Sequence, residues 1–164
     1  MIALNNIEDS NQKGTVGEDI IRKVLSTVAP VVDVRKNKKY QKLDVDFIFK
    51  DKKVEAKSDS CYNTGNYFFE VVSNAEKSTP GWAVYSEADY ILIYYPAAGE
   101  IHSIYGQDLR DWLVNNSYRF PMITNSTSGR ENKLLYHSMG VLVNRELFAK
   151  EVGAEILKVS DFIQ

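Results

Sequence analysis

The chain has 164 residues, 44% of them hydrophobic, which is the size of one domain and enough to bury a substantial core. Its 20 basic and 22 acidic residues give a formal net charge of −2, which excludes the strongly basic surface of many nucleic-acid-binding proteins. Any contact with nucleic acid must therefore be local. We predict a single domain over residues 1–164.

Several classes of protein and site are disfavoured by what the sequence lacks. The first residues contain no basic segment followed by an apolar one, and no apolar run approaches the roughly 18 residues of a membrane span. We therefore expect a soluble, cytoplasmic protein with no membrane partner. Cys61 is the single cysteine, which excludes an internal disulfide, and with His102 and His137 it shows no zinc-site spacing. No P-loop motif is present, so no nucleotide cofactor is expected.

In chain order, the first predicted element is a helix over residues 15–29, where apolar side chains repeat at helical spacing and a proline follows. A short strand is predicted over residues 31–34. The basic residues 35–42 are expected to form a loop or a ragged strand end. Apolar runs at 43–49 and 54–57, joined by four polar residues, predict a β-hairpin.

The rest of the chain alternates strands with two further helices. Residues 58–66 and 125–133 are polar and are expected to form loops, and Trp82 and Trp112 are expected in the core. Strands are predicted over residues 67–72, 89–95, 101–104 and 134–143, and helices over residues 107–114 and 145–151. This order predicts a mixed α/β or α+β domain with a central sheet.

The predicted hairpin, LDVDFIFKDKKVEAK at residues 43–57, carries three acids and a lysine that can converge. Because alternate side chains of a strand share a face, Glu55 and Lys57 project together about 7 Å apart. Asp44 and Asp46 share one face of the preceding strand, and Asp46 lies about as far before the turn as Glu55 lies after it. We therefore expect these polar groups to crowd one end of the sheet.

Carboxylates this close repel each other unless a positive charge lies between them. A magnesium or manganese ion supplies that charge, prefers hard oxygen ligands and leaves positions for water and a substrate phosphate. A lysine beside it can stabilise developing charge on the phosphate or activate the attacking water. The pattern suits metal-assisted phosphodiester hydrolysis. The alternative is an ordinary set of charge pairs across a surface hairpin.

An acid on one strand followed by Glu55-Ala56-Lys57 on the next resembles the motif of the PD-(D/E)XK nuclease superfamily. The resemblance covers about residues 15–95, and segments 64–70 and 80–82 are similar to members encoded by phages or mobile elements. No proline precedes Asp44 or Asp46, a position that is loose in the superfamily, and Asp44 is a rival for the first acid.

The resemblance implies a restriction-endonuclease-like fold, in which a central mixed β-sheet is flanked by helices. It also implies a Mg²⁺-dependent deoxyribonuclease in which Asp46, Glu55, Glu18 and the Ala56 backbone hold the metal. Lys57 would orient or activate the attacking water, so the implied catalytic set is Asp46, Glu55, Lys57 and Glu18.

Several residues have two interpretations at this stage. Glu18 either belongs to this site or forms a capping box with Thr15, and the two are equally supported. Asp59 and Glu70 could support the site, although a turn cap and a surface acid are the simpler interpretations. The basic residues either follow a phosphate backbone or form a solvated loop, and they are Arg35, Lys36, Lys38, Lys39 and Lys42.

The leading hypothesis is a metal-dependent DNA endonuclease, with junction-resolvase-like structure specificity as one option. Cutting both strands of a duplex with so small a domain would commonly require a homodimer. The second hypothesis is a non-catalytic DNA- or protein-binding module on a nuclease scaffold, which the negative net charge favours.

Overall fold

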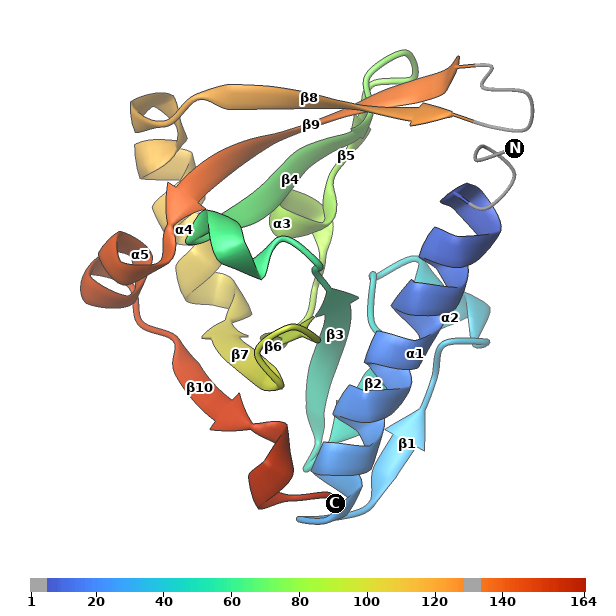
Figure 1. The fold of residues 1–164 in the computed structure, drawn as a ribbon. Helices are drawn as coiled ribbons and strands as arrows, with labels where there is room; N and C mark the ends of the chain where they lie inside the picture. The colour runs from blue at the N-terminus through green and yellow to red at the C-terminus, as the bar shows by residue number, and fades with distance from the viewer. Residues whose placement is uncertain (1–5, 129–133) are drawn as a thin grey trace.

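The computed structural model describes residues 6–128 and 134–164, which form an α+β fold with two β-sheets and flanking helices (Figure 1). The first sheet has the order β1-β2-β3-β6-β7-β10, with strands Val31–Asp33, Phe47–Phe49, Lys52–Ser58, Tyr90–Tyr95, Glu100–Tyr105 and Glu155–Lys158. The second sheet has the order β5-β4-β9-β8, with strands Thr79–Pro80, Asn66–Asn74, Leu134–Asn144 and Met122–Ser128. The helices are α1 (Asn6–Ser26), α2 (Lys38–Gln41), α3 (Trp82–Tyr85), α4 (Gly106–Asn116) and α5 (Arg145–Glu151).

Strand pairing confirms a mixed central sheet. Strands β3 and β6 are parallel, and the other neighbours in the first sheet are antiparallel. The β2–β3 hairpin closes through Lys50 and Asp51, whose φ angles of 49° and 62° are both positive. Positive φ at both central residues is what a type I′ turn requires, and this turn matches the right-handed twist of the strands. The predicted hairpin is therefore present.

The first sheet is buried on both faces. On one face, α1 packs through Ile21, Val24 and Leu25 against a cluster that includes Val54 and Ala56 of β3. On the other face, residues of β6 and β7 join a cluster with β4, β9, α4 and α5, whose members include Ile91, Tyr67, Val141, Trp112 and Phe148. Strand β3 thus presents Val54 and Ala56 to α1 and its alternate residues to the second sheet.

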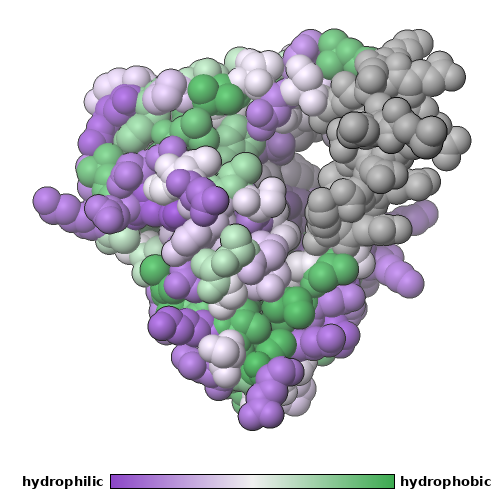
Figure 2. Space-filling model, in the orientation of Figure 1, coloured by the Kyte–Doolittle hydropathy of each residue, from purple (hydrophilic) through white to green (hydrophobic). Residues whose placement is uncertain are grey.

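The second sheet has one core face and one open face. On β4, Tyr67 and Phe69 are fully buried, whereas Phe68 and Glu70 between and beside them are only half-buried. The four-stranded sheet lies across the upper part of the molecule, with β3 directed toward it from below (Figure 1). The C-terminal residues Phe162 and Ile163 pack against the α1 cluster. Figure 2 shows hydrophobic side chains gathered in the lower part of this face, with hydrophilic ones around them.

The predicted elements are largely confirmed, and the differences have local causes. Helices α4 and α5 lie where they were predicted, with Leu109, Trp112 and Leu113 of α4 buried as expected. Helix α1 begins at Asn6, so Thr15 lies inside the helix and the predicted capping box is wrong. Residues 35–42 include the short helix α2, which Asn37 caps by accepting a hydrogen bond from the Lys39 amide.

Two strand predictions also need correction. Residues 43–46 do not belong to β2, because Asp44 has a φ of 54° and lies in a turn after α2. Residues 125–128 belong to β8 and not to a loop, because they pair with β9, while residues 129–133 of the predicted loop lie outside the described residues. Strand β10 was not predicted. Within the described residues, no helix has the length and apolar character needed to cross a membrane.

A buried polar chain links the two sheets. His102 on β7 is 2% exposed; its Nδ1 lies 2.7 Å from the Tyr67 hydroxyl on β4 and its Nε2 lies 3.3 Å from Glu100. Burial lowers the pKa of His102, and the hydrogen bond with Glu100 opposes this effect only in part. The neutral imidazole is therefore the form that the fold favours.

We expect His102 to make folding less favourable in mild acid. Its folded pKa lies below the ordinary 6.5, so the unfolded chain binds the proton more readily and stability is lost as pH falls through this range. Urea unfolding of the wild type and His102→Asn between about pH 5 and pH 8 measures the difference. The stability advantage of the wild type should shrink toward the acidic end, and a constant difference would contradict this.

Candidate functional site

Asp46 is fixed at the end of the β2–β3 hairpin by its own carboxylate. Its Oδ2 accepts a hydrogen bond of 2.9 Å from the Ala56 amide, and its backbone amide donates to the Val54 carbonyl at 2.9 Å. Asp46 lies just before β2, which begins at Phe47. Its carboxylate thus accepts the Ala56 amide hydrogen bond that a backbone carbonyl of a paired strand would otherwise accept. The contact that the structure shows for the Ala56 backbone is the hydrogen bond from its amide to Asp46, and the role of this backbone as a metal ligand stays a prediction.

Glu55 and Lys57 follow on β3 and form an ion pair on the face opposite Val54 and Ala56. The Glu55 side chain is only 3% exposed, and burial raises its pKa well above the usual range despite the charge of Lys57. Burial alone would lower the pKa of Lys57, but the charges of Glu55, Asp44 and Asp46 outweigh it and raise the pKa. The expected convergence of these four residues is therefore present.

Asp44 reaches the same place by a different route from the one predicted. It lies in the turn before β2, where its carbonyl accepts a hydrogen bond from the Ser86 hydroxyl at 2.9 Å. Among the described residues, Asp44 Oδ2 and Glu55 Oε2 are buried carboxylate oxygens without a hydrogen-bond partner. Buried oxygens of this kind are costly unless something else binds them.

Glu70 faces this cluster from the second sheet. It is half-buried, so it is not the free surface acid that the sequence favoured. Burial raises its pKa, Lys57 opposes the rise, and the charge of Asp44 adds to it. Gly81 packs directly against the backbone of Glu70. Any side chain at position 81 would collide with that backbone, so a glycine at this position allows the close approach.

Trp82 completes the surroundings of Lys57. The Lys57 ammonium lies 5.7 Å from the centre of the Trp82 ring, a cation–π distance. Trp82 is half-buried: it packs against the core cluster, as the sequence predicted, and it also lines the pocket next to Lys57. Its position next to the lysine follows from the close packing of Gly81 on β4.

Glu18 approaches from α1, on the other side of β3 from Glu55 and Lys57. Its Oε2 accepts a hydrogen bond of 3.0 Å from Arg35. Burial raises the pKa of Glu18, the Arg35 hydrogen bond opposes this, and the charge of Asp46 contributes to the rise. Glu18 is thus close enough to sense Asp46, but the partner that the structure shows for it is Arg35.

The basic segment divides into two parts. Arg35 is held by carboxylates of Glu18, Asp19 and Asp33 at 3.0, 3.0 and 2.6 Å, which does not support its predicted contact with phosphate. The lysines of this segment are exposed, and they are Lys36, Lys38, Lys39 and Lys42. The Tyr85 hydroxyl donates to the Lys42 carbonyl, so α2 lies beside α3, which begins at Trp82.

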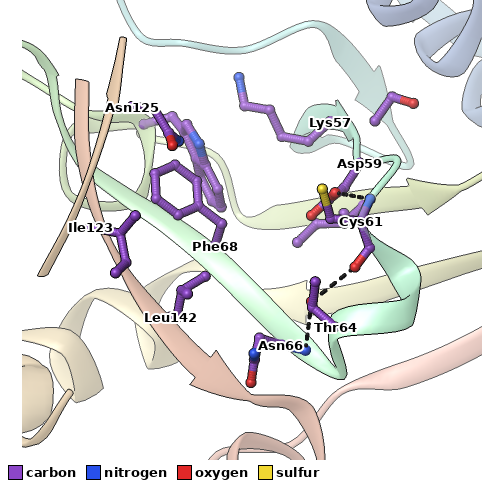
Figure 3. Close-up of a pocket in the computed structure, with 12 residues that line it drawn as sticks. Lys57, Asp59, Cys61, Thr64, Asn66, Phe68, Ile123, Asn125 and Leu142 are labelled. Carbon is purple, nitrogen blue, oxygen red and sulfur yellow. Dashed lines mark hydrogen bonds between the residues drawn. The ribbon is translucent and has the colours of Figure 1, made fainter. Parts of the chain in front are cut away.

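Asp59 has the structural role that the sequence favoured. Its Oδ1 accepts a hydrogen bond of 2.6 Å from the Cys61 amide, which fixes the turn after β3. It also lines a pocket of about 450 Å³ that opens beyond Lys57. In Figure 3, Lys57 extends toward the side of this pocket that carries Phe68 and Asn125, with Asp59 and Cys61 on the opposite side.

The cluster fits a divalent cation by its chemistry. The Lys57 ammonium pairs with Glu55, and it interacts electrostatically with the carboxylates of Asp44, Asp46 and Glu70. Hard carboxylate oxygens are what Mg²⁺ prefers, and it commonly uses one or two of them and keeps water or phosphate at its other positions. Within the described ranges, no group of three or more acid, histidine or cysteine side chains is placed so that together they could hold a metal ion. The fit is therefore to an open site built on Asp46 and Glu55.

Comparisons with known proteins add no relative: the chain matches no family model, no curated protein and no solved structure. Sequence reasoning missed the contribution of Phe68 and Trp82 and underrated that of Glu70. Strand alternation was the available signal, because Phe68 and Glu70 fall on the face opposite Tyr67 and Phe69.

We expect Asp46→Ala to destabilise the fold more than Asp46→Asn. Alanine leaves the buried Ala56 amide without an acceptor, which costs about 1 to 3 kcal/mol, whereas asparagine can still accept that hydrogen bond. Both changes remove the same negative charge from the cluster, so the comparison isolates the hydrogen bond. Urea unfolding measures both, and equal stabilities would show that the hydrogen bond contributes nothing.

Proposed function

We propose that the chain is a metal-dependent DNA endonuclease of the PD-(D/E)XK type. The observation that carries the proposal is the meeting of Asp46, Glu55 and Lys57 at one end of β3, beside buried carboxylate oxygens that have no partner among the described residues. A buried ion pair is rarely worth its desolvation cost in stability, so its presence beside further acids favours a functional role.

Each side chain has a role in this proposal. Asp46 and Glu55 would hold Mg²⁺ or Mn²⁺ together with the Ala56 carbonyl, and Glu18 would contribute through water. The bound ion would supply Lewis-acid stabilisation of the phosphate and a more acidic water. Lys57 would orient that water or stabilise negative charge on the phosphate, and its contact with Trp82 restricts where its ammonium can lie.

The exposed lysines support binding of a charged backbone. Lys36, Lys38, Lys39 and Lys42 lie on and around α2, which the Tyr85 hydrogen bond ties to α3 beside Lys57. This arrangement gives a local positive surface next to an acidic site in a protein of net charge −2. Such a surface can position a DNA strand by its phosphates without reading its sequence.

A non-catalytic binding module on the same scaffold is the second candidate. Two ion pairs favour it, Lys57 with Glu55 and Arg35 with Glu18. Each pair already neutralises a charged side chain that a nuclease would use for the metal or the attacking water. Calorimetric titration with MgCl₂ or MnCl₂ separates the two candidates, because a binding module has no need of a cation at Asp46 and Glu55.

We expect Lys57→Ala and Asp46→Asn to reduce metal-dependent cleavage by at least about 100-fold while the protein stays folded. The assay is cleavage of supercoiled plasmid, linear duplex, single strand and four-way junction with Mg²⁺, Mn²⁺ or EDTA. Lys52→Ala and Asp51→Asn are matched controls, because they remove exposed residues of the same charge at the turn end of the hairpin. Full activity in Lys57→Ala and Asp46→Asn would refute the assignment, and light scattering in the same buffer tests for the expected homodimer.

We also expect the α2 lysines to contribute salt-dependent binding. Lys38→Ala combined with Lys39→Ala should weaken DNA binding and reduce the slope of log K against log salt by about 1 for each phosphate that is no longer neutralised. Fluorescence anisotropy across a salt series measures the slope. Lys50→Ala with Lys52→Ala, two exposed lysines of the β2–β3 turn region, is the control. An unchanged slope in the α2 variant would exclude these lysines from the interface.

A further inference from the structure

The pocket beyond Lys57 is formed where the end of β3 meets the open face of the second sheet. Its volume is about 450 Å³, within the range of about 300 to 1,000 Å³ typical of small-ligand sites. Lys57 and Trp82 line it, so the pocket begins at the candidate site itself. Residues of β4, β8 and β9 supply its far wall.

The far wall is apolar and partly open to solvent. Phe68 and Leu142 are paired neighbours on β4 and β9, and Ile123 on β8 extends the same wall. All three are half-buried, although the alternate residues of β4 and β9 are in the core. Gly140 leaves room for the Phe68 ring, since a side chain there would lie 2.6 Å from its Cε2 and Cζ atoms. Apolar side chains that remain partly exposed to solvent inside a pocket indicate a ligand-binding surface.

Several of the other lining residues are neutral and polar, while Asp59 adds one acidic side chain and Ile93 an apolar one. Asn66, Asn125 and Thr64 lie around the pocket that Phe68 also lines (Figure 3). Amide side chains can both donate and accept hydrogen bonds. A flat aromatic face beside such amides matches the two surfaces of a nucleobase, its π-face and its hydrogen-bonding edge.

We infer that this pocket receives an unpaired base of the DNA strand, next to the phosphate held at Lys57. The inference rests on the proposed function, and it names the substrate class: DNA with unpaired nucleotides at the cleavage point, such as a single strand, flap or branch. In a regular duplex the base edge is paired and its faces are stacked, so the base enters only after unpairing and unstacking, which an unpaired nucleotide does not require. Phe68 supplies the stacking face, and the amide of Asn125 or of Asn66, which lie at opposite ends of the pocket, supplies hydrogen bonds to the exposed edge.

The test is binding in EDTA, where no cleavage occurs. A labelled single strand of about 12 nucleotides is titrated with the wild type and Phe68→Ala by fluorescence anisotropy. Loss of one base–aromatic stack should weaken binding about 5- to 150-fold, which corresponds to about 1 to 3 kcal/mol. Binding of a blunt duplex of the same length should be unchanged by the substitution. No loss, or an equal loss for strand and duplex, overturns the inference.

Controls separate stacking from misfolding. Tyr118→Ala removes an aromatic ring that is 83% exposed and not among the pocket-lining residues, so it should leave binding unchanged. Phe68→Leu keeps an apolar side chain at the wall, and it should lose single-strand affinity while urea unfolding stays close to the wild type. If Phe68→Leu binds the strand as the wild type does, stacking on Phe68 is excluded.

Strands with one abasic site, moved along the sequence, identify the bound base. At one position the missing base should weaken wild-type binding as much as Phe68→Ala does, and the two losses should not add. Fully additive losses at every position overturn the inference.

Binding and cleavage together distinguish failure of the pocket proposal from failure of the nuclease proposal. Phe68-dependent binding without cleavage by the wild type would support the pocket and refute the nuclease. Cleavage with Phe68-independent binding would keep the nuclease and refute the pocket.

Discussion

The two-residue side-chain period of β3 is the constraint on which the site depends. Val54 and Ala56 must face α1 to close the hydrophobic cluster, so Glu55 and Lys57 must face the second sheet. A shift of one residue in pairing would place the charges under α1 and turn the apolar side chains away from this cluster toward the second sheet. The hydrogen bond between Asp46 and the Ala56 amide holds this register at the strand end that carries the acids.

Stability alone does not explain the charges at this position. Apolar residues of similar size often replace a buried ion pair without loss of stability. Here Glu55 is nearly inaccessible, its neighbours Asp44 and Asp46 have the same charge, and two of the oxygens have no hydrogen-bond partner in the described structure. A bound cation or substrate would offset the repulsion and the unpaired oxygens of this cluster. The cluster, more than the fold, therefore indicates a function.

The sequence was most informative where local patterns decide the structure. The alternation of Glu55 and Lys57, and the count of residues from the turn to Asp46, predicted their convergence because a hairpin register follows from its turn. The start of α1 was missed because a capping box at Thr15 also fits the interior of a longer helix. Asp44 was expected in a strand, but its positive φ and its turn bring the carboxylate to the same cluster.

The second sheet could not be assembled from the sequence, because the β4–β9 pairing that joins its two halves is non-local. Phe68 pairs with Leu142, far along the chain, and nothing near either residue specifies this partner.

The alternation of core and pocket residues along these strands affects how the protein can evolve. The pocket wall uses only alternate positions of β4 and β9, and their neighbours form the core. Substitutions at the wall positions can therefore reshape the pocket while the charged cluster at β3 and the folding of the chain are inherited unchanged.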